Sequence, residues 1–192
     1  MLGQAFRSQR PDVELLTEEM WNSRMAAALH DGTIDLAVAL CPESHAELTF
    51  APIRSEKVVV LLAATHTLAG AEAISLSALA SEEFILFPRE LAPRLYETFV
   101  GLCRQAGFEP TVSKESFHTG WELGVLSDVR VVSLVPESVA RALPEGVCAV
   151  PLDQPRGRLE TSLITRIDDP SATLAAFIEV AHGAFDTESV LT

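Results

Sequence analysis

Positive charge is scarce in this sequence relative to negative charge. Its 192 residues include 14 Lys and Arg against 27 Asp and Glu, which gives a formal net charge of −13. Proteins bind nucleic acid largely by neutralising phosphates with clustered Lys and Arg, and the sequence contains no basic run. The composition therefore argues against direct DNA binding by this chain.

Long apolar runs are missing as well. The longest uninterrupted stretch, Val58 to Ala64, falls far short of the ~20 residues that a membrane-spanning helix needs. Residues 1–4 lack the charged and apolar blocks of a signal peptide. We therefore expect a cytoplasmic protein, and its 48% hydrophobic content is sufficient for a sizeable core.

Cysteines and catalytic motifs are equally sparse. The three cysteines, Cys41, Cys103 and Cys148, are odd in number and widely spaced, which favours buried free thiols over a disulfide framework. Cys41 and His45 have a metal-ligand spacing, but no second pair supports a zinc site. No nucleophile elbow, phosphate-binding loop or dinucleotide fingerprint is found. We expect no catalytic activity, no metal and no cofactor.

What the sequence does contain is an alternation of strand and helix signals. Val13 and Leu15 alternate with acidic residues after Pro11, which predicts a strand with one solvent face. Gly32 ends a predicted helix, and residues 34–40 are typical of a buried parallel strand. The pattern predicts an α/β fold with mostly parallel sheets. Further strands are expected at 48–53, 57–64, 84–87, 111–114, 131–135, 146–152 and 158–165, and further helices at 75–80, 93–106, 119–126 and 171–184.

The order of these segments resembles a known family. The motifs F-R-x-x-x-P-D-V-E-L at 6–15 and L-x-x-G-x-I-D-L-A-V at 29–38 are similar to those of the effector-binding domain of LysR-type transcriptional regulators. Matching segments follow in the family's order at 52–61, 66–69, 75–79, 84–87, 106–110 and 133–138. The resemblance covers nearly the whole chain.

This resemblance implies a two-lobed fold of the periplasmic-binding-protein-like type 2, with two crossover strands and a small-molecule cleft between the lobes. Lobe I is expected to hold residues 1–56 and 153–192, and lobe II residues 57–152. The family's DNA-binding domain and its first strand are expected to be absent from this chain. A homodimer is expected, in which residues 2–7 meet the helix 93–106 of a partner.

Candidate effector-binding residues follow partly from the pattern and partly from the resemblance. Asn22 or Ser23 is expected to cap a helix at the end of a strand, where free N–H groups favour anions; an ordinary N-cap without a ligand is the alternative. The resemblance aligns Asn22 with a residue that helps hold an effector carboxylate. It also places the following residues at or near the cleft: Arg54, Pro88, Arg89, His118 and Thr119.

Each of these residues also has a structural interpretation. Arg89 can be a solvated side chain beside Glu90, and His118 can be an ordinary surface histidine. The function implied by the resemblance is ligand sensing in a LysR-type regulator, with a small organic acid as effector. A free-standing solute-binding protein of the same fold is the alternative, and a hydrolase would need a nucleophile and base that no motif supplies.

Overall fold

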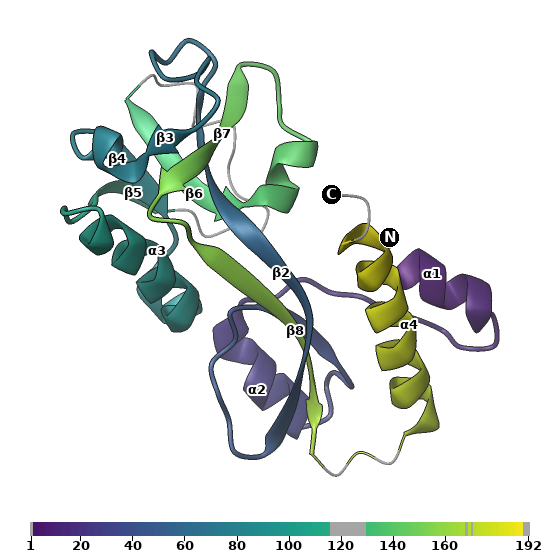
Figure 1. Cartoon of the computed structure of the whole chain (residues 1–192). Coiled ribbons are helices and arrows are strands. Elements are labelled where there is room, and N and C mark those ends of the chain that lie inside the picture. Colours follow the sequence, from purple (N-terminus) through teal and green to yellow (C-terminus); the bar gives the residue numbers. More distant parts are fainter. Residues whose placement is uncertain (1, 116–129, 168, 170, 190–192) are drawn as a thin grey trace. The chain divides into compact units, whose positions relative to one another are not determined.

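The computed structural model describes residues 2–115, 130–167, 169 and 171–189 (Figure 1). Its helices are α1 (Leu2–Gln9), α2 (Asn22–His30), α3 (Pro93–Gln105) and α4 (Ala172–Ser189). Its strands are β1 (Ala37–Leu40), β2 (Leu48–Ala63), β3 (Ile74–Ser75), β4 (Glu83–Leu86), β5 (Thr111–Glu115), β6 (Val131–Pro136), β7 (Val147–Gln154) and β8 (Arg158–Arg166). Short 3-10 helices are η1 (Leu76–Leu79), η2 (Arg89–Leu91) and η4 (Glu137–Arg141). In the described part of the chain, no helix has the length and apolar character to cross a membrane.

The chain divides into two compact units. Unit 1 comprises Met1–Arg54 and Glu160–Thr192, and unit 2 comprises Ser55–Leu159. Strands β2 and β8 each continue from one unit into the other. The sequence placed the changes of lobe at 56–57 and 152–153, and this assignment of functional lobes stays a prediction.

Unit 1 is a three-stranded arrangement, β1-β8-β2, with helices on both faces. Alternate residues of a strand point to opposite faces. Leu163 of β8 accordingly joins one core cluster with Phe6 of α1 and Phe177 of α4, whereas Ile164 joins another with Leu29 of α2. The rings of Phe6 and Phe177 are 4.9 Å apart. Helix α2 therefore covers one face of these strands, while α1 and α4 cover the other.

The predicted strand at Val13–Leu15 is wrong. Residues 13–21 form no strand, and none of the described strands pairs with them. Val13 and Leu15 instead pack against the core around Phe6, and the guanidinium of Arg7 donates a hydrogen bond to the carbonyl of Leu15 at 3.0 Å. The alternation of apolar and acidic residues at 12–15 reflects the burial of one side of this segment. One-sided burial does not require that the segment pairs with a neighbouring strand.

Unit 2 contains a mixed sheet. Strand β2 is antiparallel to both β6 and β7, whereas β4 is parallel to β5 and β6, and β3 is parallel to β7. In unit 1, β1 is antiparallel to β8. The expected α/β fold is confirmed, but the expectation of mostly parallel sheets is corrected to a mixed sheet. A run of apolar residues reports that both faces of a strand are buried, and it carries no information on the direction of the neighbouring strand.

Helix ends follow the sequence closely. Pro93 occupies the first turn of α3 as predicted. Gly107 follows α3 with φ of +92°, and Phe108 N–H returns to the Cys103 carbonyl at 3.1 Å. Gly32 likewise follows α2 with φ of +76°. These positions require a left-handed backbone, which glycine adopts without steric cost. The predicted helix at 119–126 lies outside the described residues.

Candidate functional site

The start of helix α2 is the first candidate site. Trp21 is its N-cap, and no side chain caps the helix. The prediction that Asn22 or Ser23 is the cap is therefore wrong. Asn22 is already the first helical residue, and its amide Nδ2 donates to the carbonyl of Leu40 at 2.9 Å. The N-cap position requires non-helical backbone angles, which Trp21 adopts and the helical residue Asn22 does not.

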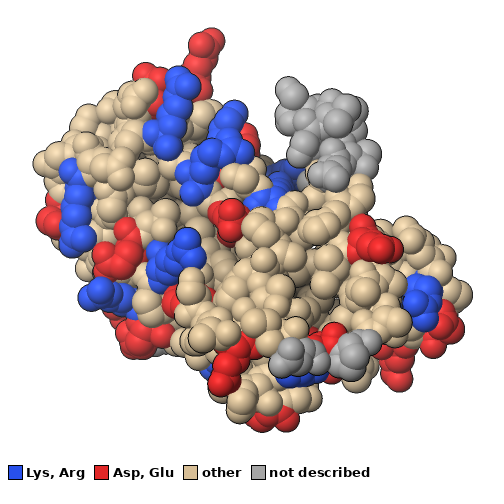
Figure 2. Space-filling view, turned by 60° about the horizontal axis from the view of Figure 1, so that its bottom comes forward, with Lys and Arg blue, Asp and Glu red and all other residues tan. Residues whose placement is uncertain are grey.

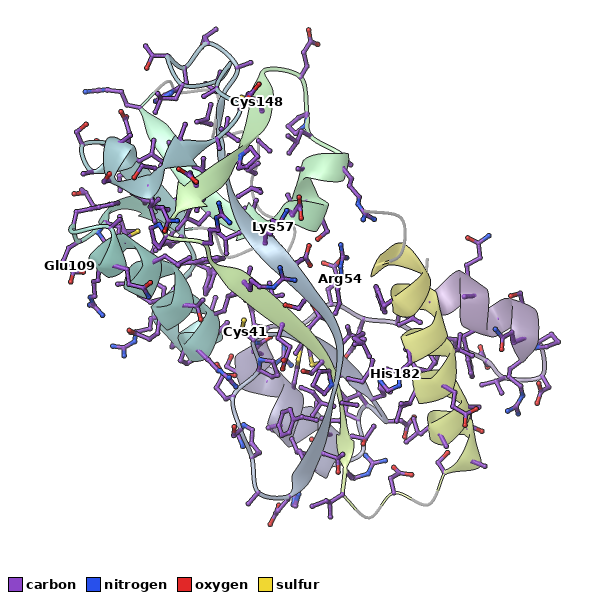
Figure 3. All side chains as sticks on the ribbon, in the orientation of Figure 1. Cys41, Arg54, Lys57, Glu109, Cys148 and His182 are labelled. Atoms are coloured by element: carbon purple, nitrogen blue, oxygen red, sulfur yellow. The ribbon has the colours of Figure 1, made fainter. Side chains whose placement is uncertain are left out.

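The Asn22 hydrogen bond ties the first turn of α2 to the carboxyl end of β1. The next residue, Cys41, has φ of +48°, which is uncommon for a residue with a side chain. Its N–H donates to the Glu160 carbonyl at 2.7 Å, and Figure 3 shows Cys41 near α2. Strand β1 thus ends in a sharp turn next to the uncapped helix start.

A small hollow opens beside this turn. Its volume is about 10 Å³, close to the space that one water molecule needs. Its polar members are Asn22, Glu43 and His45, and the remaining lining residues are Met25, Ala26, Pro42, Leu48, Phe50 and Ile164. Ligand pockets are usually some hundreds of Å³. This hollow is therefore too small to enclose a whole ligand.

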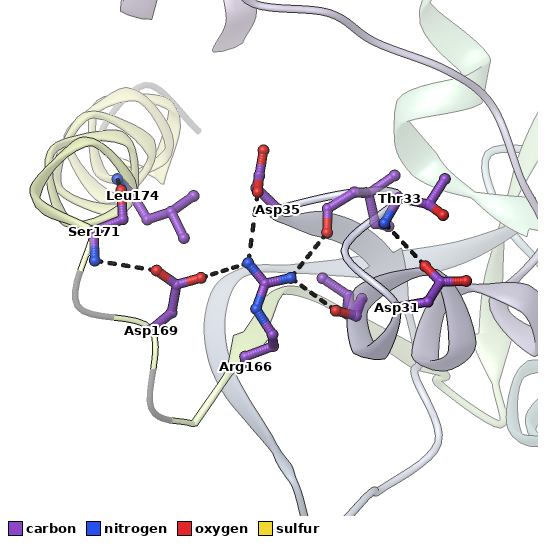
Figure 4. A network of polar contacts seen from close by, with 9 residues as sticks. Asp31, Thr33, Asp35, Arg166, Asp169, Ser171 and Leu174 are labelled. Atoms are coloured by element: carbon purple, nitrogen blue, oxygen red, sulfur yellow. Dashed lines mark hydrogen bonds and ion pairs between the residues drawn. The ribbon is translucent and has the colours of Figure 1, made fainter.

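The opposite end of α2 is held by Arg166 (Figure 4). The Arg166 guanidinium donates to the carbonyls of Leu29 at 2.7 Å and Ile34 at 3.2 Å, and it pairs with Asp169 at 2.6 Å. Asp31 accepts a hydrogen bond from the Thr33 N–H, and this hydrogen bonding holds the pKa of the Asp31 carboxyl below its usual value. Both ends of α2 are thus tied to the surrounding unit, which fixes the direction of its N-terminus.

Arg54, the last residue of the first segment of unit 1, contacts α4. Its guanidinium carbon lies 5.9 Å from the ring centre of Phe185, within the range of a cation–π contact. Figure 3 shows Arg54 between β2 and α4. The predicted role of Arg54 in anion binding stays a prediction.

Pro88 and Arg89 follow β4 in unit 2. Pro88 is buried, whereas the Arg89 side chain is 66% exposed and pairs with Glu97 of α3 at 2.9 Å. Glu97 also approaches Arg104 at 3.5 Å, and Arg104 pairs with Glu109 at 2.6 Å. Arg89 thus ends a chain of exposed ion pairs on α3. Exposed pairs of this kind contribute about 0–1 kcal/mol each, so Arg89 can exchange its partner at small cost.

Four of the predicted site residues form two groups, and Arg54 lies apart from both in β2. Asn22 and Ser23 lie together in the first turn of α2, and Pro88 and Arg89 lie together after β4. His118 and Thr119 lie outside the described residues. Arg24, which was not among the predicted residues, is a further candidate because it is exposed in the same first turn of α2 as Asn22. Arg24 lies two residues after Asn22, and this spacing alone places it in the same helical turn.

Two of the three thiols, Cys103 and Cys148, have pKa values shifted away from activation. Burial raises the pKa of the Cys103 thiol to about 12, and it also raises the pKa of Cys148. A cysteine nucleophile needs the opposite shift, because the thiolate is the reactive form. Among the described residues no group of three or more His, Cys, Asp or Glu could hold a metal ion.

Acidic and basic side chains are interspersed on the face shown in Figure 2. That face carries no broad area of positive charge. A DNA-binding surface normally gathers Lys and Arg on one side, so nothing in this view indicates a phosphate-binding surface.

The sequence of this chain is similar to a known protein family and to several curated proteins. The family described as "LysR substrate binding domain" matches residues 2–186. The HTH-type transcriptional regulator AlsR of Bacillus subtilis is 27% identical over 177 residues, which are 92% of this chain and 59% of AlsR. The transcriptional dual regulator GltC of the same organism is 30% identical over 162 residues, 83% of this chain and 53% of GltC. The chain thus spans little more than half the length of these relatives.

Solved structures share the fold. The structure described as "BenM effector binding domain with its effector benzoate" has a TM-score of 0.85 at 21% identity, covering 98% of this chain and 86% of that one. "Effector binding domain of QuiR in complex with shikimate" has a TM-score of 0.82 at 20% identity, covering 97% and 89%. These likenesses confirm the periplasmic-binding-protein-like type 2 fold class. With the family match over residues 2–186, the chain belongs to the LysR substrate-binding domain family.

Proposed function

We propose that this chain is the ligand-sensing regulatory domain of a cytoplasmic LysR-type transcription factor, without enzymatic activity, and that it binds a small organic acid between two lobes. The observation that carries the proposal is the uncapped start of α2, held at the end of β1 by Asn22. Unpaired N–H groups at a helix start attract anions, and the helix dipole adds to this attraction.

Basic side chains support an anionic ligand. Arg24 lies in the first turn of α2, and Arg89 follows β4 in a weak, exposed ion pair. Arginine binds a carboxylate through two parallel hydrogen bonds. BenM and QuiR are described with benzoate and shikimate, and both of these ligands carry a carboxylate. We propose Asn22, Ser23, Arg54, Pro88, Arg89, His118 and Thr119 as the effector-binding residues, with Arg24 added.

The proposed partners are a second copy of the chain and, through a domain outside this sequence, DNA. The dimer predicted from the sequence would place residues 2–7 against α3 of a partner. The apolar residues of α3, among them Leu95, Phe99 and Leu102, are buried within the chain, so the contact would use polar residues of α3 such as Arg94. Light scattering at tens of micromolar tests this arrangement, and a monomer would contradict it.

Calorimetry with a panel of carboxylic acids, including benzoate and shikimate, tests the site. Losing one charge-assisted contact should weaken binding by about ten- to a hundredfold. We expect that loss for Asn22→Ala and Arg89→Ala. Arg104→Ala is the matched control, because it removes an arginine of the same ion-pair chain away from the end of β4. Acids that bind wild type and both variants equally would show that the ligand lies elsewhere.

A further inference from the structure

Strands β2 and β8 carry the chain through the boundary between the two units. The boundary falls between Arg54 and Ser55 on β2 and between Leu159 and Glu160 on β8, and these strands are neighbours in the sheet. Figure 3 labels Arg54 and Lys57, on either side of Ser55. Any movement of one unit against the other must be taken up by the backbone of these two strands, so the contacts at the boundary decide where that backbone can bend.

One arginine joins the two strands at this point. Arg158 Nε donates to the hydroxyl of Ser55 at 2.9 Å, and Arg158 Nη2 donates to the carbonyl of Ser55 at 2.7 Å. The planar guanidinium presents both donors in a fixed fork, so less side-chain freedom is lost per hydrogen bond formed. Ser55 is the first residue of unit 2, and Arg158 is close to its last. The fork thus holds both the backbone and the side chain of the opposite strand at the edge of unit 2.

Neighbouring contacts anchor the strands on each side of the boundary. In unit 2, the Val58 N–H donates to the Gly157 carbonyl at 3.0 Å. A Cβ at Gly157 would lie 2.5 Å from the Leu102 side chain, so this segment is packed closely against α3. In unit 1, the Glu160 carbonyl accepts the Cys41 N–H at 2.7 Å. On β8, the link between Leu159 and Glu160 thus lies between a segment anchored in unit 2 and a residue anchored in unit 1.

We propose that Arg158 is a clip that locks β2 to β8 at the edge of unit 2 and confines bending to the links Arg54–Ser55 and Leu159–Glu160. Hinges in proteins are typically a few residues that absorb the backbone change. The regulatory meaning of the clip rests on the proposed function. An effector that closes two lobes would then act on a short, defined hinge instead of a long flexible connection.

The test compares Arg158→Gln with Arg156→Gln in the ligand-free protein. Arg156 is a matched control because it is an exposed arginine two residues earlier whose hydrogen bonds go to Asp153, at 3.2 Å and 3.5 Å. Amide hydrogen exchange at Val58 and ¹⁵N relaxation of residues 55–58 and 157–159 are the readouts. We expect Arg158→Gln to accelerate exchange at Val58 about fivefold and to make these residues mobile, while Arg156→Gln behaves as wild type.

A milder variant extends the test. Ser55→Ala removes one of the two acceptors, so it should accelerate exchange at Val58 less than Arg158→Gln and at the same residues. Exchange and relaxation of Arg158→Gln that match wild type would overturn the proposal, as would an equal change in Arg156→Gln. Because no ligand is added, this outcome is independent of whether an organic acid binds.

Discussion

Replacing Gly157 by alanine places a methyl group where two buried side chains already lie. The new Cβ would lie 2.5 Å from Leu102 Cδ1, 2.9 Å from Val58 Cγ2 and 3.1 Å from Leu102 Cδ2. Leu102 is 5% exposed and Val58 is 2% exposed, so neither can move into solvent. The φ of Gly157 is outside the left-handed region, and the cost is therefore one of packing alone.

The expected loss in the free energy of unfolding follows from this overpacking. Extra methyl groups forced into a packed core cost about 1–3 kcal/mol. In a protein of this size, that loss lowers the melting temperature by about 2–12 °C. Urea unfolding followed by circular dichroism, together with a thermal scan, measures both quantities. The slope of the urea transition should stay unchanged, because the surface exposed on unfolding is nearly the same.

Gly101→Ala is the matched control within the same region. Gly101 lies in α3 beside Leu102, and a Cβ there would meet no atom within 4 Å. Alanine should stabilise this helix by up to about 1 kcal/mol. The two substitutions make the same chemical change, so opposite signs would isolate the crowding at Gly157.

The double variant Gly157→Ala/Leu102→Ala tests the cause. Leu102→Ala alone should cost about 2–5 kcal/mol through its cavity, but it also removes the atoms that the new methyl group meets. The double variant should therefore lose less stability than the two single losses added together. Additive losses, or a Gly157→Ala protein as stable as wild type, would refute the reasoning.

Three further predictions concern other parts of the chain. Phe6→Ala should destabilise unit 1 by about 3–5 kcal/mol, because the ring is 1% exposed and packs on Phe177; a loss under 1 kcal/mol in urea unfolding, well below that range, would contradict the packing. Arg166→Met should cost about 1–3 kcal/mol, measured the same way, by leaving two backbone carbonyls and one carboxylate oxygen of Asp169 without their donor. Burial raises the pKa of the Cys103 thiol from 9.0 to about 12. Between these pH values the thiol stays protonated in the folded protein but loses its proton in the unfolded chain. The free energy of unfolding should therefore fall as the pH rises from 9.0 toward 12. In Ellman's assay Cys103 should react only as fast as the protein unfolds.

Much of the architecture could be predicted from local patterns. Gly107 and Gly32 mark the ends of α3 and α2, and Pro93 marks a start, because each residue restricts or frees its own φ. The buried strands at 84–87 and 131–135 were found because both of their faces are apolar. The family was found from short motifs in a conserved order, and the match over residues 2–186 confirms it.

The candidate site was less accessible from sequence. Asn22 was identified as a residue of interest, but its role changed from a cap to an anchor on Leu40. Asn22 would cap α2 only if the helix began one residue later. Adjacent residues have similar helix propensities, so the sequence does not fix the first helical residue that closely. The partner of Arg89 is Glu97, in the following helix, and the sequence alone did not indicate this pair.

By itself the sequence determined properties that belong to single residues or to short segments: charge, the turns at glycine and proline, the burial of apolar runs and the family motifs. Tertiary structure alone decided which segments pair. Val13–Leu15 has the pattern of a strand and forms none, whereas β2 runs unbroken over Leu48–Ala63 where two strands were expected. A backbone hydrogen-bond ladder needs a neighbour brought from elsewhere in the chain. No local pattern encodes which neighbour arrives or in which direction it runs.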